Sequence, residues 1–218
     1  MRIPRLLLAA LALAAIPAIA PAAHADEAPP APADPAKDPQ VARLLLAKKT
    51  LKTNQPMGPI NDRYGHAEAL VEATPEQLVK TATEFGKYRE LHRKFKTARV
   101  IGKEGDQTDV YMRYPVQIGP MTIELYEVMR FAPDRTVGTT HIIEARGIKG
   151  DMKRGHTVIT IKPVDAKHSL LSVDVLLVPV LPAPQSYVDE ELRDGAEDFV
   201  DGLRDRSQPT KGPVVSLN

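Results

Sequence analysis

The stretch DVYMRYPVQIGPMTIELYEVMRF, residues 109–131, decides the fold class of this chain. Apolar and polar side chains alternate on both sides of Gly119-Pro120, a pattern typical of two β-strands joined by a tight turn. A two-residue turn there places Tyr114 opposite Leu125 and puts the apolar side chains of both strands on one face. The stretch therefore predicts an antiparallel hairpin with one apolar face.

Strands continue on the C-terminal side of this hairpin. The pattern predicts three of them, over residues 136–145, 156–162 and 170–179, with a loop from Gly147 to Gly155. The last strand alternates most regularly, and the residues of its buried side are Leu171, Val173, Val175 and Leu177. The centre of the chain is therefore expected to be an antiparallel sheet.

Helical periodicity flanks the strands on both sides. After a strand that begins at His66, Thr74-Pro75-Glu76 supplies an N-cap followed by proline at the first helical position. Gly86 interrupts this helix, and a second short helix follows it, with its apolar residues at Tyr88, Leu91 and Phe95. Residues 187–206 then form one long amphipathic helix with an acidic outer side.

The first 25 residues have the features of a cleavable signal peptide. Arg2 and Arg5 precede an uncharged apolar run, Leu6–Ala20, which at about 15 residues is short for a membrane span. Ala23-His24-Ala25 offers small residues at the cleavage positions. We expect export, into a bacterial periplasm, and because the chain has no cysteine we do not expect a lipoprotein.

The remaining boundaries follow from composition. Residues 26–60 are predicted to be a proline-rich linker, in which the apolar spacing of residues 41–51 is compatible with a short helix. Residues 61–206 form the folded domain. Residues 207–218 are expected to be a disordered tail.

Composition also excludes several classes of function. With 29 Lys+Arg against 28 Asp+Glu, the formal net charge is +1, so no overall field attracts nucleic acid. The absence of cysteine excludes disulfides and thiol catalysis. The histidines lack metal-binding spacing and no glycine-rich phosphate loop follows a strand, so we expect no metal and no cofactor. Oligomeric state is not indicated by the sequence.

The order of elements predicts an α+β fold. A strand and two short helices precede a strongly curved antiparallel sheet of about six to seven strands, which wraps around the long C-terminal helix.

Four features of the sequence carry a resemblance to a known family: Thr74-Pro75-Glu76, Phe85-x-x-Tyr88, the pair Gly147 and Gly150, and Pro179-x-x-Pro182 before the final helix. On these, residues 64–206 resemble the START-like helix-grip (SRPBCC) superfamily, in particular its polyketide cyclase/dehydrase and lipid-transport family, which includes coenzyme Q-binding proteins. The resemblance implies a cavity between sheet and helix for a lipid, sterol, quinone or polyketide.

The predicted inner face is rich in methionine, which suits a flexible apolar ligand. Three functions stay open. A non-enzymatic binding or transport protein for an apolar small molecule is favoured, a cyclase or dehydratase type of enzyme is the second, and a protein-interaction module with a filled core is the third. The residues expected to contact ligand are Phe85, Tyr88, Met112, Tyr114, Met121, Ile123, Leu125, Met129, His141, Ile143, Leu192 and Phe199.

Two polar residues interrupt this apolar face. A three-residue turn after the hairpin places Glu127 opposite His141, whereas a two-residue turn places Thr140 there. As a pair they would orient the polar head of a ligand or, in an enzyme, act with Tyr114 as acid and base. A purely structural hydrogen bond is the alternative.

A basic cluster surrounds the second short helix, and its members are Lys87, Arg89, Arg93, Lys94 and Lys96. We expect this end to make peripheral contact with anionic lipid headgroups. The alternative is an ordinary solvated surface.

Overall fold

The computed structural model describes residues 38–58, 62–92, 94–118 and 121–208. The helices are α1 (Pro39–Ala47), α2 (Pro75–Thr83), the 3₁₀ turn η2 (Phe85–Lys87), α3 (Tyr88–Leu91) and α4 (Gln185–Ser207). The strands are β1 (Leu51–Met57), β2 (Asp62–Val71), β3 (Thr97–Glu104), β4 (Gln107–Ile118), β5 (Met121–Phe131), β6 (Arg135–Val137), β7 (Thr140–Gly150), β8 (Met152–Pro163) and β9 (Ser169–Pro179).

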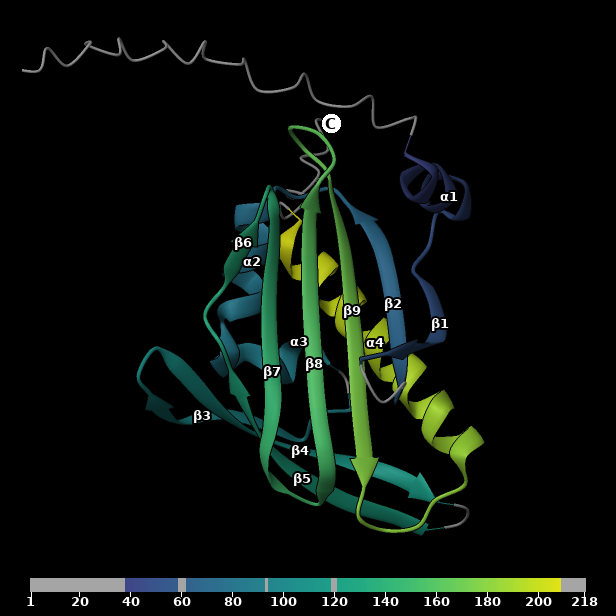
Figure 1. The fold of residues 1–218 in the computed structure, drawn as a ribbon, viewed down its shortest axis with the longest axis vertical. Coiled ribbons are helices and arrows are strands. Elements are labelled where there is room, and N and C mark those ends of the chain that lie inside the picture. Colours follow the sequence, from purple (N-terminus) through teal and green to yellow (C-terminus); the bar gives the residue numbers. More distant parts are fainter. Residues whose placement is uncertain (1–37, 59–61, 93, 119–120, 209–218) are drawn as a thin grey trace, which may run out of the picture. The chain divides into compact units, whose positions relative to one another are not determined.

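All strands belong to one antiparallel sheet in the order β1-β2-β9-β8-β7-β5-β4-β3, with β6 paired to β7. Figure 1 shows β2, β9, β8 and β7 running side by side, while β3, β4 and β5 run across their lower ends. Helix α4 lies across the inner face, where it packs on β2 and β9. The predicted α+β class, with a curved sheet around a long C-terminal helix, is confirmed. The described sheet has nine strands, more than the six to seven expected.

The hairpin register is confirmed. In the pairing of β4 with β5, Tyr114 lies opposite Leu125 and Met112 lies opposite Glu127. Alternation of side chains along paired strands therefore puts Met112, Tyr114, Leu125 and Glu127 on the same face of the sheet. That face is the inner one, since all four residues are buried.

The start of α2 is also confirmed. The side chain of Thr74 accepts a hydrogen bond from the Gln77 backbone N–H (3.4 Å), and the Gln77 side chain accepts one from the Thr74 backbone N–H (2.8 Å). This reciprocal pair satisfies two of the free donors at the helix start. The second short helix is shorter than expected, because α3 ends at Leu91 and Phe95 lies beyond it.

Two segments expected to be loops are strands. The loop predicted from Gly147 to Gly155 is wrong, because β7 runs to Gly150 and β8 begins at Met152. A glycine inside a strand often marks a place where other atoms approach the backbone closely. Gly147 and Gly155 lie at such a place, since the side chain of Glu127 packs against both. The linker prediction fails over residues 51–57, which form β1; Pro56 fits there because β1 is an edge strand paired only with β2.

The short helix expected over 41–51 lies at Pro39–Ala47 and docks on the domain. Its buried residues Val41 and Leu44 pack with Leu170 of β9. The predicted signal peptide, the first part of the linker and most of the C-terminal tail fall on residues 1–37 and 209–218, outside the described residues. No helix in the described part of the chain combines the length and apolar character needed to cross a membrane.

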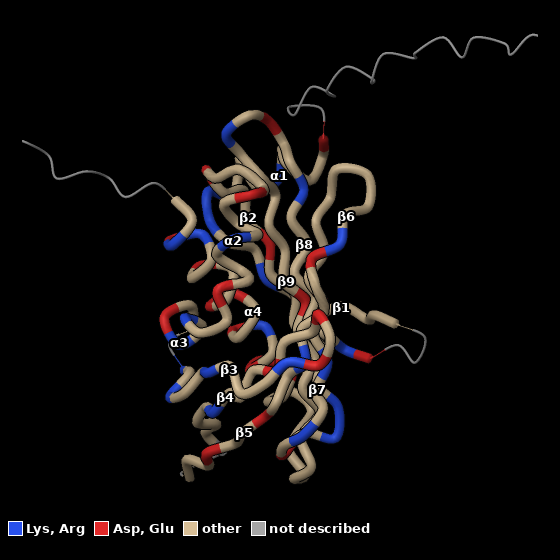
Figure 2. Tube along the Cα trace, turned by 90° about the vertical axis from the view of Figure 1, so that its left-hand side faces the viewer, with Lys and Arg blue, Asp and Glu red and all other residues tan. Residues whose placement is uncertain are grey.

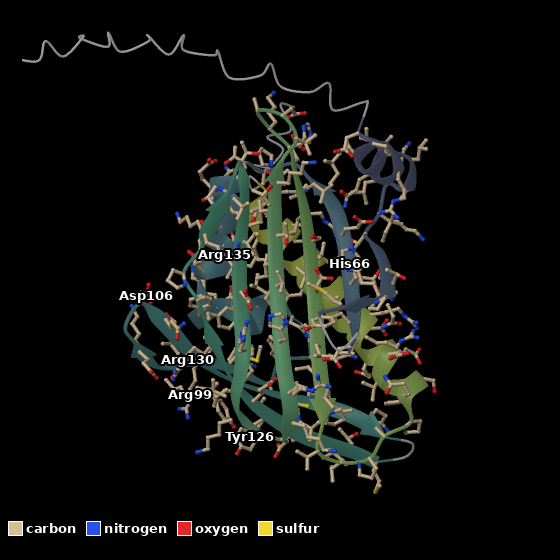
Figure 3. All side chains as sticks on the ribbon, viewed as in Figure 1. His66, Arg99, Asp106, Tyr126, Arg130 and Arg135 are labelled. Carbon is tan, nitrogen blue, oxygen red and sulfur yellow. The ribbon has the colours of Figure 1, made fainter. Side chains whose placement is uncertain are left out.

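Charged residues of both signs are interspersed over the described elements, as Figure 2 shows. On the outer face of the hairpin, Arg130 donates to Asp109 through Nε (2.7 Å). On the same face of the sheet, between β2 and β9, His66 contacts Asp174 (2.8 Å); Figure 3 labels Arg130 and His66. Burial disfavours the charged form of His66, but Asp174 and Glu68 outweigh it and raise the pKa of His66. These contacts lie on the outer face of the sheet.

Candidate ligand-binding cavity

The inner face of the sheet is only partly covered by packed side chains. One part is a solid core, in which side chains of α2, α3 and the C-terminal half of α4 meet those of β2, β8 and β9. The other part is a cavity of about 150 Å³ between the β4–β5 hairpin, the end of β9 and the N-terminal half of α4. The expected space between sheet and helix is therefore present, but it occupies only one part of that interface.

The cavity wall is strongly apolar. The hairpin contributes Met112, Tyr114, Leu125 and Met129, and α4 contributes the facing Leu192 and Phe199. Leu181, on the loop between β9 and α4, also lines the cavity and is 46% exposed, so the cavity opens to solvent near this loop. An apolar ligand would exchange contact with water for contact with these side chains.

Glu127 is a buried acidic residue of this wall. It is 2% exposed, and its Oε1 atom has no hydrogen-bond partner in the part of the chain that the structure describes. Burial raises the pKa of Glu127 to about 8. At neutral pH the carboxyl is therefore mostly protonated and can donate a hydrogen bond.

Two glycines make room for this carboxyl. Gly147 of β7 and Gly155 of β8 lie beneath the Glu127 side chain, and a Cβ atom added to either would overlap its Oε1 atom. Any larger residue at these positions would displace the carboxyl from the sheet surface. The Gly147–Gly155 pair therefore forms a niche that fixes the position of Glu127.

Tyr114 supplies a second polar atom on the same wall. Its hydroxyl is buried and also has no partner among the described residues. Burial, together with the nearby charges of Glu127 and Asp151, raises the pKa of Tyr114 well above its usual value. Tyr88 differs from it, because its buried hydroxyl donates to the backbone carbonyl of Ala82 (2.6 Å).

Charged and imidazole groups also border the cavity. Lys94 pairs with Glu191 of α4 (2.9 Å), and both side chains are about one third exposed. His92 stacks on Phe95, with ring centroids 4.5 Å apart, and its Nδ1 accepts a hydrogen bond from the Lys94 backbone N–H (3.2 Å). The cation that lines the cavity is therefore paired at its edge.

Many of the residues expected to contact ligand do line the cavity: Tyr88, Met112, Tyr114, Leu125, Met129, Leu192 and Phe199. They lie at inner-face positions of the hairpin, on α3, or on the apolar stripe of α4. Their placement follows from the periodicity of about two residues in a strand and about 3.6 residues in a helix, which determines the face on which each side chain lies.

Five expected contact residues lie elsewhere. Phe85 packs against Tyr88 and Phe131 in the aromatic part of the solid core, and Ile143 is fully enclosed in that core. Met121 is 60% exposed and Ile123 is partly exposed, since both lie near the hairpin tip, beyond the cavity. The sequence periodicity predicted which face of the strand or helix these residues lie on. It could not predict whether that part of the face borders the cavity, the solid core or solvent.

The fifth is His141, and neither of the two pairings that the turn length left open for Glu127 is formed, the one with His141 or the one with Thr140. His141 faces Thr136 of β6 and Ile161 of β8, and its Nδ1 contacts Asp134 (2.7 Å). Glu127 instead faces Gly150 of β7. The strand predicted over residues 136–145 is divided, because Arg135–Val137 form the separate strand β6 and β7 begins only at Thr140; β7 then pairs with β5 near its far end.

The sequence also missed part of the wall. Val175 and Leu177 of β9, and Leu181 and Ala183 of the following loop, line the cavity, as do His92, Phe95, Thr157, Tyr187 and Val188. The regular alternation of β9 marked Val175 and Leu177 as inner-face residues. It did not show that a cavity begins there.

Among the described residues, no group of three or more His, Asp or Glu side chains is placed to hold a metal ion. The cavity chemistry that these residues support is burial of apolar surface and hydrogen bonding by Glu127 and Tyr114.

No protein-family model matches the sequence, and no curated protein matches it significantly. Solved structures do match. The STAR-related lipid transfer protein of Xanthomonas axonopodis aligns with a TM-score of 0.59 and 13% identity, over 73% of this chain and 93% of that one. Human StAR-related lipid transfer protein 5 aligns with a TM-score of 0.58 and 11% identity, over 73% and 82%. A START superfamily protein of Mycobacterium smegmatis gives 0.55 and 17%, over 65% and 94%. The chain therefore has a START-like helix-grip fold.

Proposed function

We propose that this protein binds an apolar small molecule in the cavity between the β4–β5 hairpin and α4, and carries or sequesters it without chemical change. The observation that supports this most is the apolar hollow itself, on the inner face of a START-like fold. Two of the similar structures are described as lipid transfer proteins, which favours the same class of ligand here. A filled-core interaction module agrees less well with this hollow.

The size of the cavity limits the range of ligands that it can hold. Its volume of about 150 Å³ equals that of an engineered apolar cavity that binds benzene and lies below the roughly 300–1,000 Å³ of sites for drug-sized ligands. An acyl chain end or a single quinone ring fits this space better than a four-ring sterol. Each methylene buried there contributes about 0.8 kcal/mol.

Export into a periplasm is part of the proposal and rests on the N-terminal sequence. Its test is cell fractionation of the full-length chain in a bacterial host, followed by N-terminal sequencing. We expect the exported form to begin at Asp26. A full-length protein retained in the cytoplasm would contradict export and leave ligand binding unaffected.

Peripheral membrane contact also remains a proposal. Lys87, Lys94 and Lys96 form ion pairs with acidic residues, which reduces the positive charge available to an anionic surface. Exposed apolar side chains at Met121 and Leu181 offer a second source of affinity. Co-sedimentation with anionic and neutral vesicles tests the contact, since equal recovery with both would remove the role of charge.

An enzyme of the cyclase or dehydratase type is the second candidate. The observation that favours it is the buried carboxyl of Glu127, diagonal to Tyr114 on the paired strand, because a buried acid with a raised pKa can protonate a leaving hydroxyl. Turnover of a hydroxylated or polyketide substrate that is lost in Glu127→Gln, with binding retained, would support this candidate over simple transport.

Native mass spectrometry of protein purified from its own compartment, followed by lipid extraction, tests the first candidate. Val175→Phe fills the cavity from the inner face of β9, whereas Val178→Phe adds the same volume on the outer face of that strand. We expect a bound apolar molecule in the wild type and in Val178→Phe, and its loss in Val175→Phe. Equal occupancy in all three proteins would place the ligand elsewhere and refute the proposal.

A further inference from the structure

Two residues of the cavity wall, Glu127 and Tyr114, each carry a buried polar side-chain atom that simple apolar binding does not use. These atoms are Oε1 of Glu127 and the hydroxyl of Tyr114, and neither has a hydrogen-bond partner among the described residues. Folded proteins satisfy most buried polar groups, so an unsatisfied pair in a cavity indicates a site that an occupant completes. The occupant must then supply polar atoms as well as apolar surface.

The two groups are neighbours on adjacent strands. Glu127 lies opposite Met112, and Tyr114 is the next residue of β4 on the same face. Such diagonal neighbours lie within reach of each other's long side chains. The charge of Glu127 also contributes to the raised pKa of Tyr114, which agrees with this proximity. A small head group can therefore approach both.

The surroundings of Glu127 determine what kind of head group suits it. Its raised pKa has burial as its cause, with no cation contributing, so the carboxyl at neutral pH is a neutral donor. The glycine niche of Gly147 and Gly155 holds that carboxyl against the sheet. Lys94, a cation of the cavity lining, pairs with Glu191 at the edge.

We propose that the cavity selects ligands whose apolar body carries an uncharged oxygen, a hydroxyl or a carbonyl, which accepts a hydrogen bond from Glu127 and contacts the hydroxyl of Tyr114. This inference rests on the proposed function, since it takes the cavity as the ligand site. A pure hydrocarbon leaves both protein groups unpaired. An anionic head loses its hydration beside another acidic group, so it binds more weakly.

The test is competition at pH 7 against fluorobenzene, an uncharged probe of the size that a cavity of about 150 Å³ can hold. Its binding is followed by the ¹⁹F NMR signal of the probe. The competitors are 1-hexanol, n-hexane and hexanoate, which share a six-carbon body. Because hexane and hexanol differ in their own hydration, the informative quantity is how each variant changes the ratio of their inhibition constants.

We expect Glu127→Met and Tyr114→Phe to weaken hexanol relative to hexane by about tenfold, as expected for loss of a buried hydrogen bond. Glu127→Gln keeps a neutral donor and should change the ratio by less than about threefold. Glu124→Gln is the matched control, because Glu124 is an exposed residue of the same strand paired with Lys96 and Arg113. In the wild type, hexanoate should compete at least about tenfold more weakly than hexanol.

The outcomes separate the two proposals. If Val175→Phe abolishes probe binding but the hexanol-to-hexane ratio is unchanged in Glu127→Met and Tyr114→Phe, or hexanoate equals hexanol, the head-group inference is overturned and apolar binding stands. If the wild type does not bind the probe, or Val175→Phe binds it equally, the proposed function fails and the inference with it. Thermal unfolding of each variant verifies that the fold is intact.

Discussion

The interface between the sheet and α4 has one tightly packed part and one part that contains the cavity, although β9 has the same alternation of apolar residues in both. On the inner face of β9, Leu171 and Val173 are completely buried, whereas the next two residues on that face, Val175 and Leu177, are partly exposed and line the cavity. We call these the packed half and the hollow half. One strand with a single regular pattern therefore serves a solid core and an open site.

The difference comes from what lies opposite the strand. In the packed half, α2 and α3 pack against α4, and Gly202 of α4 lets the backbone carbonyl of Leu91 come so close that a Cβ atom there would overlap it. In the hollow half, a Cβ atom at Gly195 of α4 would meet nothing nearer than His92 Nε2 at 3.7 Å. Helices α2 and α3 therefore close the space beside the C-terminal half of α4, whereas the N-terminal half contacts the sheet closely at Gly65 of β2 but leaves a cavity on the side of the β4–β5 hairpin.

The largest expected effect compares the same substitution in both halves. Leu171→Ala removes a fully enclosed side chain and should lower the free energy of unfolding by about 4 kcal/mol. Leu177→Ala, on the same face of the same strand, should cost about 1 kcal/mol, because its side chain already borders a cavity. Chemical denaturation of both variants measures the difference, and similar losses would mean that the two halves are equally packed.

The second effect concerns the buried acid of the hollow half. The pKa of Glu127 rises from 4.5 to about 8 on folding. Between these values the unfolded chain loses the proton and the folded chain keeps it, so this group makes stability fall as pH rises from about 4.5 to about 8. Glu127→Gln removes that loss, so the free energy of unfolding of this variant relative to wild type should be about 4.5 kcal/mol higher at pH 9 than at pH 4.

Other titratable side chains line the same cavity, namely Tyr88, His92, Lys94, Tyr114, Tyr187 and Glu191. They are common to the wild type and Glu127→Gln, so the difference between the two pH profiles isolates Glu127. Glu124→Gln, on the outer face, serves as the control. Parallel profiles for wild type and Glu127→Gln would show that Glu127 is ionised at neutral pH.

The third effect compares two glycines on α4. Gly202→Ala forces α4 away from Leu91 and should destabilise the protein by about 2 kcal/mol. Gly195→Ala meets no obstruction and should stabilise the helix by about 0.5–1 kcal/mol. If the two halves differ as described, the thermal unfolding midpoint falls in Gly202→Ala and rises in Gly195→Ala. A loss at Gly195 would mean that α4 lies closer to its neighbours there.

The smallest effect on stability is expected at exposed apolar residues. Met121→Ser on β5, of the hairpin that lines the cavity, and Val137→Ser on β6 should each change unfolding free energy by less than about 0.5 kcal/mol. If the hollow half faces a membrane, only Met121→Ser lowers recovery with anionic vesicles. Equal recovery of both variants would speak against contact through the hairpin tip.

Much of the fold could be predicted from local chemistry. The hairpin register followed from Gly119-Pro120 and the alternation on both sides of it, and the start of α2 from Thr74-Pro75. The bounds of α4 followed from one apolar stripe. These features depend on residues near each other in sequence, whose spacing alone fixes which way side chains lie.

What could not be predicted depends on contacts between distant residues. The strand β1 (LKTNQPM) has weak alternation and a proline, and it becomes a strand because β2 offers it an edge. The segment Gly147–Gly155 looked like a loop because its glycines serve Glu127, more than 15 residues earlier in the chain. The Glu127–His141 pair failed for a similar reason, since β6 takes up the residues between β5 and β7.

The niche beneath Glu127 has a consequence for how relatives of this protein evolve. Positions 127, 147 and 155 share one small volume, so a long side chain at the first requires the smallest possible residue at the other two. Descendants that replace the acid with a shorter side chain are released from that restriction and can acquire alanine or serine on β7 and β8. These three positions should therefore covary, and a glycine pair there would identify homologues that have kept the acid.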